Sequence, residues 1–590
     1  MNIKIQKTDG PSRTGEIIVD KEKIRFPNII FIDTNRFKNP KNADLILREE
    51  IESFKINDIF IIDEDKINIF LKDEKQIEND DLCIVPDDID QIEKCIKNNK
   101  QSKIFIVSNA LQLFQKNNDF VDYIVKLREE IGYKKQIYLP GVATPDNIAL
   151  LSYLGIDLFD NIQAVIAARN NILLFTDNKF FINELKYNHC TCKYCMKNEN
   201  ISKMGFNDIL NHNNHMFFTS IRKTINMIYN NNLRNFIERN TKISPHNTSI
   251  LRILDLNKYD FLEKRTSIIS DHMLISTCKE SLSRPDIKRF QNRIMNRYNK
   301  PESAKILLLL PCSSRKPYSF SKSHSFFIRE IKKCHNPHLI HEMIITSPIG
   351  LVPRELELIY PVSSYDIPVT GIWDFDEQNM IKTLISCYLK DNSYDEIILH
   401  LPNNITFFLK DVIKNPVISC VDHPTSKKST DKLGSILRKH VSKYDKIKAS
   451  IRKKEDMLNI ASYQFGREIA ERLVDNSIIK GKYPYIKIMD KKGQIGMTTL
   501  DRGYISLTLQ GAEILHSENK FFVEISPDFN IKGDIFAPGV INADPDIRSG
   551  DEVTIIRKNN LVGVGVAMMN GDEMIDLDYG ISLKTRHILK

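Results

Sequence analysis

Several features are missing from this 590-residue sequence. No stretch approaches eighteen uninterrupted apolar residues, so we expect no membrane-spanning helix. The N-terminus, MNIKIQKTDGPSRTGE, has no apolar core of the kind that a signal peptide needs. The chain also contains no glycine-rich nucleotide-binding loop and no signature of a redox cofactor. These absences predict a cytoplasmic protein with no membrane contact, whose chemistry needs neither ATP nor NAD.

Cysteine is scarce, and its distribution is uneven. Ten cysteines are too few for a disulfide scaffold in a chain of this length, yet three lie close together. Cys190, Cys192 and Cys195 have the spacing C-x-C-x-x-C, and His212 and His215 follow about one helical segment later. Three thiolates and one imidazole suit a tetrahedral zinc site, and four protein ligands would make it structural. Unrelated thiols are the alternative, but clustered thiols without a metal oxidise easily.

The composition bounds the class of protein. The length predicts about three to five domains, each able to bury a core. Apolar residues make up 42% and charged residues 27%, as in ordinary globular proteins. The net charge of +8 favours a polyanionic partner such as nucleic acid, although the abundance of Lys, Asn and Ile is also consistent with coding bias.

A βαβ pattern precedes the cysteines. After apolar stretches at 27–34 and 102–110, residues 121–160 suggest a helix, a strand, a Gly-containing turn, a helix and a short strand that ends at Asp160. Such alternation predicts a parallel sheet, in which ligands bind beyond the carboxyl ends of the strands. Asp160 is therefore a candidate nucleophile or base, and a helix cap is the alternative.

The stretch AKILLLLPCSSRKPYSFSKSH, residues 304–324, joins an apolar run to a cysteine and a basic loop. The run is a predicted buried strand, and later apolar strands alternate with helices, which predicts a separate α/β domain. Cys312 then lies at the carboxyl end of a strand, where such domains bind ligands. A buried cysteine followed by a solvated loop is the alternative. The later predicted strands are 341–347, 395–401 and 416–422.

The segment YLPGVATPDNIALLSYLGIDLFD, followed by CTCKYC and the pair His212-Asn213, resembles the archaeal tRNA-guanine transglycosylase family. That family has a TIM barrel and a zinc site of this composition. The resemblance implies that His212 is the fourth ligand and that Asp160 matches the nucleophilic aspartate. However, the chain has no SGGFQ segment, and too few residues precede Asp160 for a complete barrel. We therefore expect a trimmed barrel, and base exchange is not the favoured reaction.

Two later segments resemble the archaeosine synthase branch of that family. They are PCSSRKPYSFSKSH at 311–324 and TSPIGLVPRELELIYPVSSYDIPVTGIWD at 346–374. The branch modifies the nitrile of 7-cyano-7-deazaguanine that is already present in the D-arm of tRNA. The resemblance covers most of residues 121–590, whereas the first 120 match weakly.

This resemblance gives the basic loop a chemical role. A nitrile carbon is electrophilic but slow to add an amine, so an enzyme would bind it covalently or protonate its nitrogen. We expect Arg315, Lys316 and Lys322 to depress the pKa of Cys312 and keep it nucleophilic. His324 would supply the proton. Lys316 is alternatively the attacking amine or a phosphate clamp.

Further polar residues near the two segments are candidates for holding the substrates. A carboxylate beside the loop suits the amino group of an incoming donor, and Trp373 suits a flipped deazaguanine. The alternative without a binding role is that part of segment 346–374 forms a short amphipathic helix and that Trp373 packs in the core. The candidate substrate-binding residues are Ser313, Arg315, Ser323, Glu355 and Asp366.

The C-terminal part alternates short strands with Gly, Asp and Asn turns, which predicts a small β-barrel. It resembles the RNA-binding PUA domain through GDIFAPGVINADPDIRSGDEV and GVGVAMM. The resemblance implies that Gly533, Pro538 and Gly539 bring the backbone close to RNA. The basic segment 426–460 is either a solvated helical face or a second RNA-facing surface.

Together these patterns predict an α/β multidomain protein that modifies tRNA. Its reaction would add an amine donor, a lysine or glutamine nitrogen, to the nitrile on the route to archaeosine, with structural Zn2+. The alternatives are a base-exchanging transglycosylase and a non-catalytic tRNA-binding subunit. A partner enzyme that completes archaeosine and a homodimer are both compatible with the sequence. The expected domains are a degenerate barrel at 1–300, an α/β catalytic domain at 301–425, a mixed domain at 426–518 and a PUA barrel at 519–590.

Overall fold

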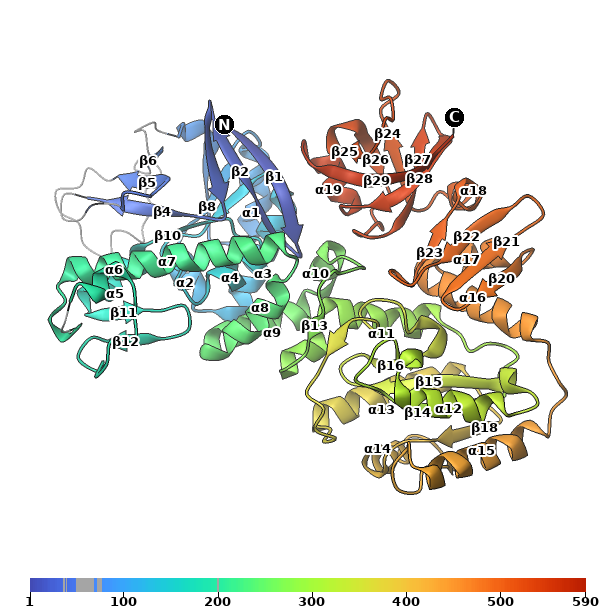
Figure 1. The fold of residues 1–590 in the computed structure, drawn as a ribbon. Coiled ribbons are helices and arrows are strands. Elements are labelled where there is room, and N and C mark those ends of the chain that lie inside the picture. The colour runs from blue at the N-terminus through green and yellow to red at the C-terminus, as the bar shows by residue number, and fades with distance from the viewer. Residues whose placement is uncertain (35–37, 39, 49–67, 72–76, 199–200, 590) are drawn as a thin grey trace. The chain divides into compact units, whose positions relative to one another are not determined.

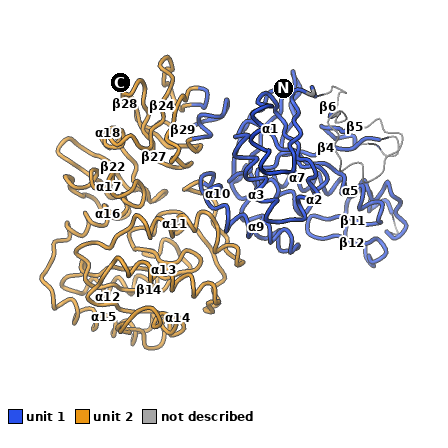
Figure 2. Tube along the Cα trace, turned by 180° about the vertical axis from the view of Figure 1, so that it is seen from behind, with its two compact units in different colours: residues 1–266, 536–538, 572–582 blue, residues 267–535, 539–571, 583–590 orange. Residues whose placement is uncertain are grey.

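The computed structural model describes residues 1–34, 38, 40–48, 68–71, 77–198 and 201–589, which form two compact units (Figure 2). The first unit comprises residues 1–266 with two short C-terminal segments, 536–538 and 572–582, and the second comprises the rest. Among the described residues, no helix combines the length and apolar character that crossing a bilayer requires.

An open seven-stranded sheet forms the centre of the first unit, in the order β6-β5-β4-β10-β9-β8-β7 (Figure 1). Its neighbouring strands are parallel except β5 and β6. The strand NIIFID is apolar and buried at most positions, as expected where a parallel sheet is covered on both faces. This half-barrel sheet confirms the trimmed barrel. The strands are β4 (Asn28–Asp33), β5 (Leu45–Arg48), β6 (Asn68–Leu71), β7 (Leu82–Val85), β8 (Ile104–Val107), β9 (Gln136–Tyr138) and β10 (Leu158–Asp160).

A long helix and a hairpin follow the last strand of this sheet. Helix α7 (Phe206–Tyr229) packs against α5 (Ile162–Arg169) and strand β11 (Ile172–Leu174). Strand β11 pairs with β12 (Lys179–Phe181), and the short helix α6 (Lys193–Met196) packs on α7. The cysteine segment is therefore held against the first turns of α7.

The second unit contains the predicted α/β domain, a five-stranded sheet in the order β16-β15-β14-β18-β19. All pairs are parallel except β15 with β16, so the strands β14, β15 and β18 end at the same edge. Pro311 pairs with Ile345, which brings Cys312 and Thr346 to that edge as neighbours. The strands are β14 (Ile306–Pro311), β15 (Ile340–Thr346), β16 (Gly350–Pro353), β18 (Glu396–Leu399) and β19 (Val417–Ile418).

Further helices and two more sheets make up the rest of the second unit and the C-terminal barrel. Helix α11 (Pro285–Arg297) belongs to this unit although it precedes residue 300, and Gln291 donates to the carbonyl of Ile349 at 3.2 Å. A four-stranded sheet has the order β20-β21-β22-β23, and its strands are β20 (Ile478–Lys482), β21 (Tyr485–Met489), β22 (Gln494–Thr498) and β23 (Ile505–Leu507). The last sheet has six strands in the order β25-β29-β28-β27-β24-β26. They are β24 (Phe522–Ile525), β25 (Ile535–Phe536), β26 (Val540–Ala543), β27 (Glu552–Arg557), β28 (Asn560–Ala567) and β29 (Ile581–Ile588).

Candidate functional site

The structure brings together the four residues that the sequence predicts as zinc ligands. Cys190, Cys192, Cys195 and His212 are all buried, and their ligand atoms lie within 4.8 Å of one another. The His212 Nδ1 atom lies 3.5, 3.5 and 3.3 Å from the three sulfur atoms in that order. Tetrahedral zinc with ordinary bond lengths requires sulfur-to-nitrogen separations of about 3.5 Å. The donor set and its spacing therefore fit zinc, whereas His215 is exposed and is not part of this group.

The pair His212-Asn213 is positioned by one residue of strand β11, Leu174. The His212 Nε2 atom lies 2.9 Å from the Leu174 carbonyl oxygen, and Asn213 accepts from the Leu174 N–H at 2.8 Å. A hydrogen bond at the second ring nitrogen orients a metal-binding histidine and leaves the other nitrogen free to coordinate. Consecutive residues at the start of α7 thus anchor the hairpin and present Nδ1 to the cysteines.

Asp160 lies at the carboxyl end of β10, as predicted, and its carboxylate is occupied by protein donors. It accepts from the Tyr138 hydroxyl at 2.9 Å, the Gly141 N–H at 2.7 Å and the Ile162 N–H at 2.9 Å. The residue is fully buried, and this burial raises its pKa to about 6. The bond to Ile162 at the start of α5 is the cap-like role that the sequence offered as the alternative.

Cys312 begins a cluster of polar side chains at the edge of the α/β sheet. The Thr346 hydroxyl hydrogen-bonds the Cys312 thiol and lies 2.5 Å from the Tyr365 hydroxyl. The Tyr365 hydroxyl in turn lies 2.7 Å from that of Tyr318. The Lys316 ammonium sits 3.9 Å from the centre of the Tyr365 ring, a cation–π contact beside the thiol. We call these five side chains the thiol cluster.

The electrostatics of Cys312 differ from the sequence prediction. Burial raises the pKa of the thiol, whereas the hydrogen bond from Thr346 and the charge of Lys316 lower it by less. The expected depression is therefore wrong in direction. Arg315 is exposed, so water screens its charge from the sulfur. Burial likewise lowers the pKa of Lys316, which increases the neutral fraction of its amine.

The proton-donating role of His324 stays a prediction, and the surroundings of the ring favour its neutral form. Its Nε2 atom lies 3.0 Å from the Pro311 carbonyl oxygen, and its Nδ1 atom accepts from Arg354 at 2.8 Å. The side chain is fully buried, and burial with the nearby Arg354 charge lowers its pKa to about 2. Arg354 is itself paired with Glu342 at 2.8 Å and Glu357 at 3.0 Å. His324 is thus a neutral clamp on the end of β14.

The predicted substrate-binding residues do not form one group. Asp366 is exposed, and its charge acts on Lys316, so it lies near the thiol cluster. Glu355 instead accepts from the Tyr298 hydroxyl at 2.6 Å and is also within 3.4 Å of the Asn459 amide. The Ser323 hydroxyl lies 3.1 Å from that of Ser321. Ser313 is half-buried and Arg315 exposed in the loop that follows β14.

The three predicted RNA-contact residues differ in their surroundings. Gly533 and Pro538 are exposed, and a Cβ atom on Gly533 would meet nothing within 4 Å. Gly539 is buried, and a Cβ atom there would lie 2.7 Å from the Phe529 ring. Internal packing therefore accounts for glycine at 539, while positions 533 and 538 remain available to a partner.

Sequence reasoning missed Thr346, Tyr318 and Tyr365 as members of the thiol cluster. Tyr318 stands within the quoted 311–324 segment, so its position gave a signal. Thr346 ends β15, and parallel pairing with β14 places that end beside Cys312. Tyr365 stands within the quoted 346–374 segment, and it pairs with Leu274 in a short parallel bridge between distant segments.

Family models match three parts of the chain. Residues 88–245 match the family described as queuine tRNA-ribosyltransferase, residues 287–437 match a domain of unknown function, DUF5591, and residues 527–589 match the PUA domain. A half-barrel with a buried metal-ligand set, joined to an RNA-binding PUA domain, defines a transglycosylase-like protein of tRNA modification.

Similar proteins narrow this class. The chain is 32% identical over 508 residues to archaeosine synthase subunit alpha of Methanosarcina acetivorans, covering 83% of this chain and 80% of that protein. It is 30% identical over 494 residues to archaeosine synthase of Haloferax volcanii, covering 82% of each. A tRNA-guanine(15) transglycosylase of Methanobrevibacter smithii is 26% identical, covering 80% of this chain and 69% of that protein. The chain belongs to the archaeosine synthase family.

Proposed function

We propose that this chain adds the amine of a donor amino acid to the nitrile of 7-cyano-7-deazaguanine in tRNA. The observation that carries the proposal is the thiol cluster, in which Cys312 lies at the carboxyl end of a parallel strand with a lysine and a hydroxyl as neighbours. Family membership supports the choice of substrate, since relatives are named archaeosine synthases.

The first step forms a covalent bond between the enzyme and the base. The Cys312 sulfur attacks the nitrile carbon, a carbon–sulfur bond forms, and one carbon–nitrogen π bond breaks to give a thioimidate. The thiol is protonated near neutral pH because burial raises its pKa, so a base must remove its proton. The amine of Lys316, whose pKa burial lowers, suits this role and can return the proton to the nitrile nitrogen.

The second step releases the enzyme. The donor amine attacks the thioimidate carbon, a carbon–nitrogen bond forms and the carbon–sulfur bond breaks. The departing sulfur recovers a proton from the amine nitrogen, so the net product is an amidine and the enzyme is regenerated. A lysine or glutamine nitrogen would be the donor, and no oxidant or reductant is consumed.

The other parts of the chain support this chemistry without taking part in it. Zinc held by Cys190, Cys192, Cys195 and His212 would stabilise the hairpin, because four protein ligands leave no open position. The PUA barrel and the exposed Gly533 and Pro538 would contact tRNA. We place the protein in the cytoplasm. Since three relatives are named subunit alpha, a second subunit would complete archaeosine from the adduct. A homodimer stays a prediction.

Mass spectrometry of cyano-modified tRNA tests the proposal. After incubation with the chain and each amino acid in turn, the nucleoside should gain the mass of one donor. A loss of the cyano base in exchange for labelled guanine would instead show base exchange through Asp160. An unchanged tRNA that still binds would favour a non-catalytic subunit.

A further inference from the structure

A hairpin turn of the four-stranded sheet contacts the α/β domain close to the thiol cluster. Tyr483 lies in this turn, between strands β20 and β21, which are labelled in Figure 1. Its hydroxyl donates to the Glu357 carboxylate at 2.6 Å, and Glu357 is fully buried. The Tyr483 ring also lies near that of Phe320, with 6.1 Å between the ring centres. A side chain from outside the α/β domain is therefore bonded to one of its buried carboxylates.

Glu357 holds one end of the loop that follows β14. The Ser319 N–H donates to its second carboxylate oxygen at 3.0 Å. Ser319 directly follows Tyr318, a member of the thiol cluster, and Lys316 stands three residues before Ser319. A hydrogen bond from a backbone N–H to an ionised acceptor is strong, so it fixes this peptide. The position of the peptide in turn limits where the neighbouring Tyr318 and Lys316 side chains lie.

Glu357 also holds the other end of this loop, through two intermediate side chains. Arg354 donates to the same carboxylate at 3.0 Å and to the His324 Nδ1 atom at 2.8 Å. The His324 Nε2 atom lies 3.0 Å from the carbonyl oxygen of Pro311, which directly precedes Cys312. One buried carboxylate is therefore linked to both ends of the loop that carries the thiol and the lysine.

We propose that Tyr483 is a positioning residue for the addition reaction, which holds Glu357 and thereby keeps the Lys316 amine and the Cys312 thiol in place. The inference rests on the proposed function for the reaction itself, but the fastening of the loop can be measured without that reaction. The Tyr483 hydroxyl acts through Glu357, since its hydrogen bond is made to the Glu357 carboxylate. Small displacements of reacting groups lower the rate strongly, so a loosened loop would slow the chemistry.

Two further observations support a lasting contact between the hairpin turn and the loop. Burial and the nearby Glu357 charge raise the pKa of Tyr483, so its hydroxyl stays protonated and keeps donating at neutral pH. The Ser319 hydroxyl also lies 3.5 Å from the Tyr483 hydroxyl. The same residue whose N–H is bonded to Glu357 is therefore next to the tyrosine that holds Glu357.

Tyr483→Phe tests the inference, because it removes the hydroxyl and keeps the ring beside Phe320. The matched control is Tyr485→Phe, which changes an exposed tyrosine two residues later in the same hairpin. Steady-state addition to cyano-modified tRNA by the full-length protein gives kcat and the KM for tRNA. We expect Tyr483→Phe to lower kcat about tenfold to a hundredfold with an unchanged KM for tRNA, and the control to match wild type.

A double variant tests whether Tyr483 acts through Glu357. Glu357→Gln should also lower kcat, and Tyr483→Phe combined with Glu357→Gln should lose no more than Glu357→Gln alone, since both changes affect one hydrogen bond. Losses that multiply in the double variant would overturn the inference, as would a wild-type kcat in Tyr483→Phe.

Alkylation by iodoacetamide, with no tRNA or amino acid present, separates this inference from the proposed function. Peptide mass spectrometry follows the half-buried Cys312 and, as a reference for unfolding, Cys420, which is buried in the same domain. Loss of a hydrogen bond to a charged group should open the loop more often, so Tyr483→Phe should speed alkylation of Cys312 about tenfold and leave Cys420 unchanged.

The outcomes of the two assays differ for the two claims. Unchanged alkylation of Cys312 in Tyr483→Phe, or equal acceleration at Cys312 and Cys420, would overturn the inference. Selective acceleration at Cys312, together with no adduct formation by wild type, would contradict the proposed function and leave the fastening of the loop supported.

Discussion

Replacing His324 by glutamine tests whether this side chain is a neutral clamp or an acid. A glutamine amide can donate to the Pro311 carbonyl oxygen and accept from Arg354, as the imidazole does. His324→Gln should therefore keep most of the nitrile-addition activity, whereas His324→Ala removes both bonds and should lower stability by about 3 to 5 kcal/mol.

The pH dependence of stability gives the sharper result. The pKa of His324 is about 2 in the folded chain and about 6.5 when unfolded, so the unfolded chain takes up the proton first. The stability that the neutral ring contributes is complete above pH 6.5 and is lost as the pH falls toward 2. Each pH unit below 6.5 costs about 1.4 kcal/mol, which makes about 2 kcal/mol between pH 6.5 and pH 5.

Urea unfolding can be followed by the fluorescence of Trp373, the only tryptophan, which lies in the same α/β domain and near Phe408. Between pH 6.5 and pH 5, the free energy of unfolding should fall by about 2 kcal/mol more in wild type than in His324→Gln. The control His335→Gln changes an exposed histidine and should follow wild type. If His324→Gln had the same pH dependence as wild type, His324 would titrate normally and would again be a candidate acid.

The remaining predictions concern the metal, the RNA and Asp160. The chain should hold close to one zinc ion; atomic absorption should show that Cys192→Ser and His212→Ala lose it and that His215→Ala keeps it. Zinc loss in His215→Ala with full zinc in His212→Ala would show that His215, and not His212, is the ligand. Deleting residues 519–590 should weaken tRNA binding and its salt dependence in filter assays. Unchanged affinity would show that the basic segment 426–460 or the half-barrel binds the tRNA instead. Asp160→Asn should lower thermal stability by about 1 to 3 kcal/mol with adduct formation retained, since a buried N–H loses its acceptor, whereas abolished turnover with normal stability would favour base exchange.

The sequence predicted those parts of the molecule that depend on local spacing. The cysteine motif and the His212-Asn213 pair lie close together in the chain, between residues 190 and 213, and the half-barrel strands are apolar runs. Asp160 was placed correctly at a strand end because βαβ alternation dictates that position. Two of its hydrogen-bond donors, Tyr138 and Gly141, come from strand β9 and the turn after it, about twenty residues earlier, so the sequence did not show that its carboxylate is fully hydrogen-bonded.

The chemistry of Cys312 was predicted less well because burial and distant contacts determine it. The basic character of the loop suggested a depressed pKa, yet Arg315 points to solvent and desolvation outweighs the charge of Lys316. Arg354, which engages His324, stands 30 residues farther along the chain. The sequence does not show which charged side chains are exposed to water, and the direction of the pKa shifts of Cys312 and His324 depends on that exposure.

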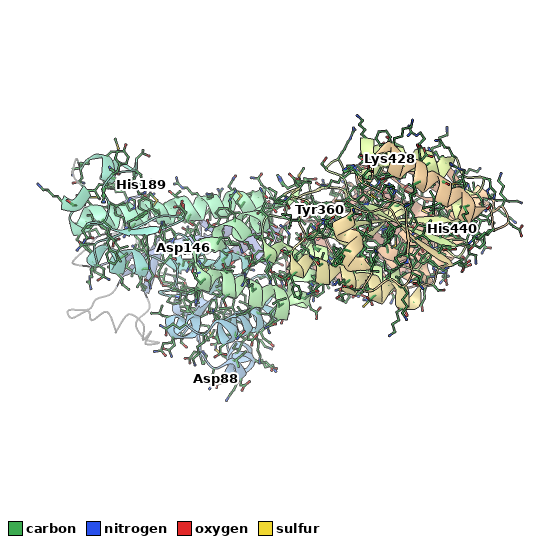
Figure 3. The ribbon with its side chains drawn as sticks, turned by 90° about the horizontal axis from the view of Figure 1, so that it is seen from below. Asp88, Asp146, His189, Tyr360, Lys428 and His440 are labelled. Carbon is green, nitrogen blue, oxygen red and sulfur yellow. The ribbon has the colours of Figure 1, made fainter. Side chains whose placement is uncertain are left out.

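The two interpretations of the basic segment 426–460 also depend on which of its side chains are exposed. Lys428, which is exposed, and His440, which is half-buried and lies 2.9 Å from Glu396, are labelled in Figure 3. Both belong to helix α15 (Lys427–Val441), which packs on α12 (Lys322–Lys332). The helix is amphipathic, as the solvated-face interpretation of segment 426–460 requires. An additional role of this face in RNA binding stays a prediction that the deletion of residues 519–590 tests.

The central claim is that the Cys312 sulfur attacks the nitrile, and trapping the covalent intermediate tests it most directly. Full-length protein is mixed with cyano-modified tRNA without any amino acid and resolved on a denaturing gel. Wild type and Cys387→Ser, which changes an exposed cysteine of the same domain, should form a protein–tRNA band that disappears when donor is added. Cys312→Ser should form none while binding tRNA normally. A band of equal intensity from Cys312→Ser, or addition of the donor at the wild-type rate by that variant, would contradict the account.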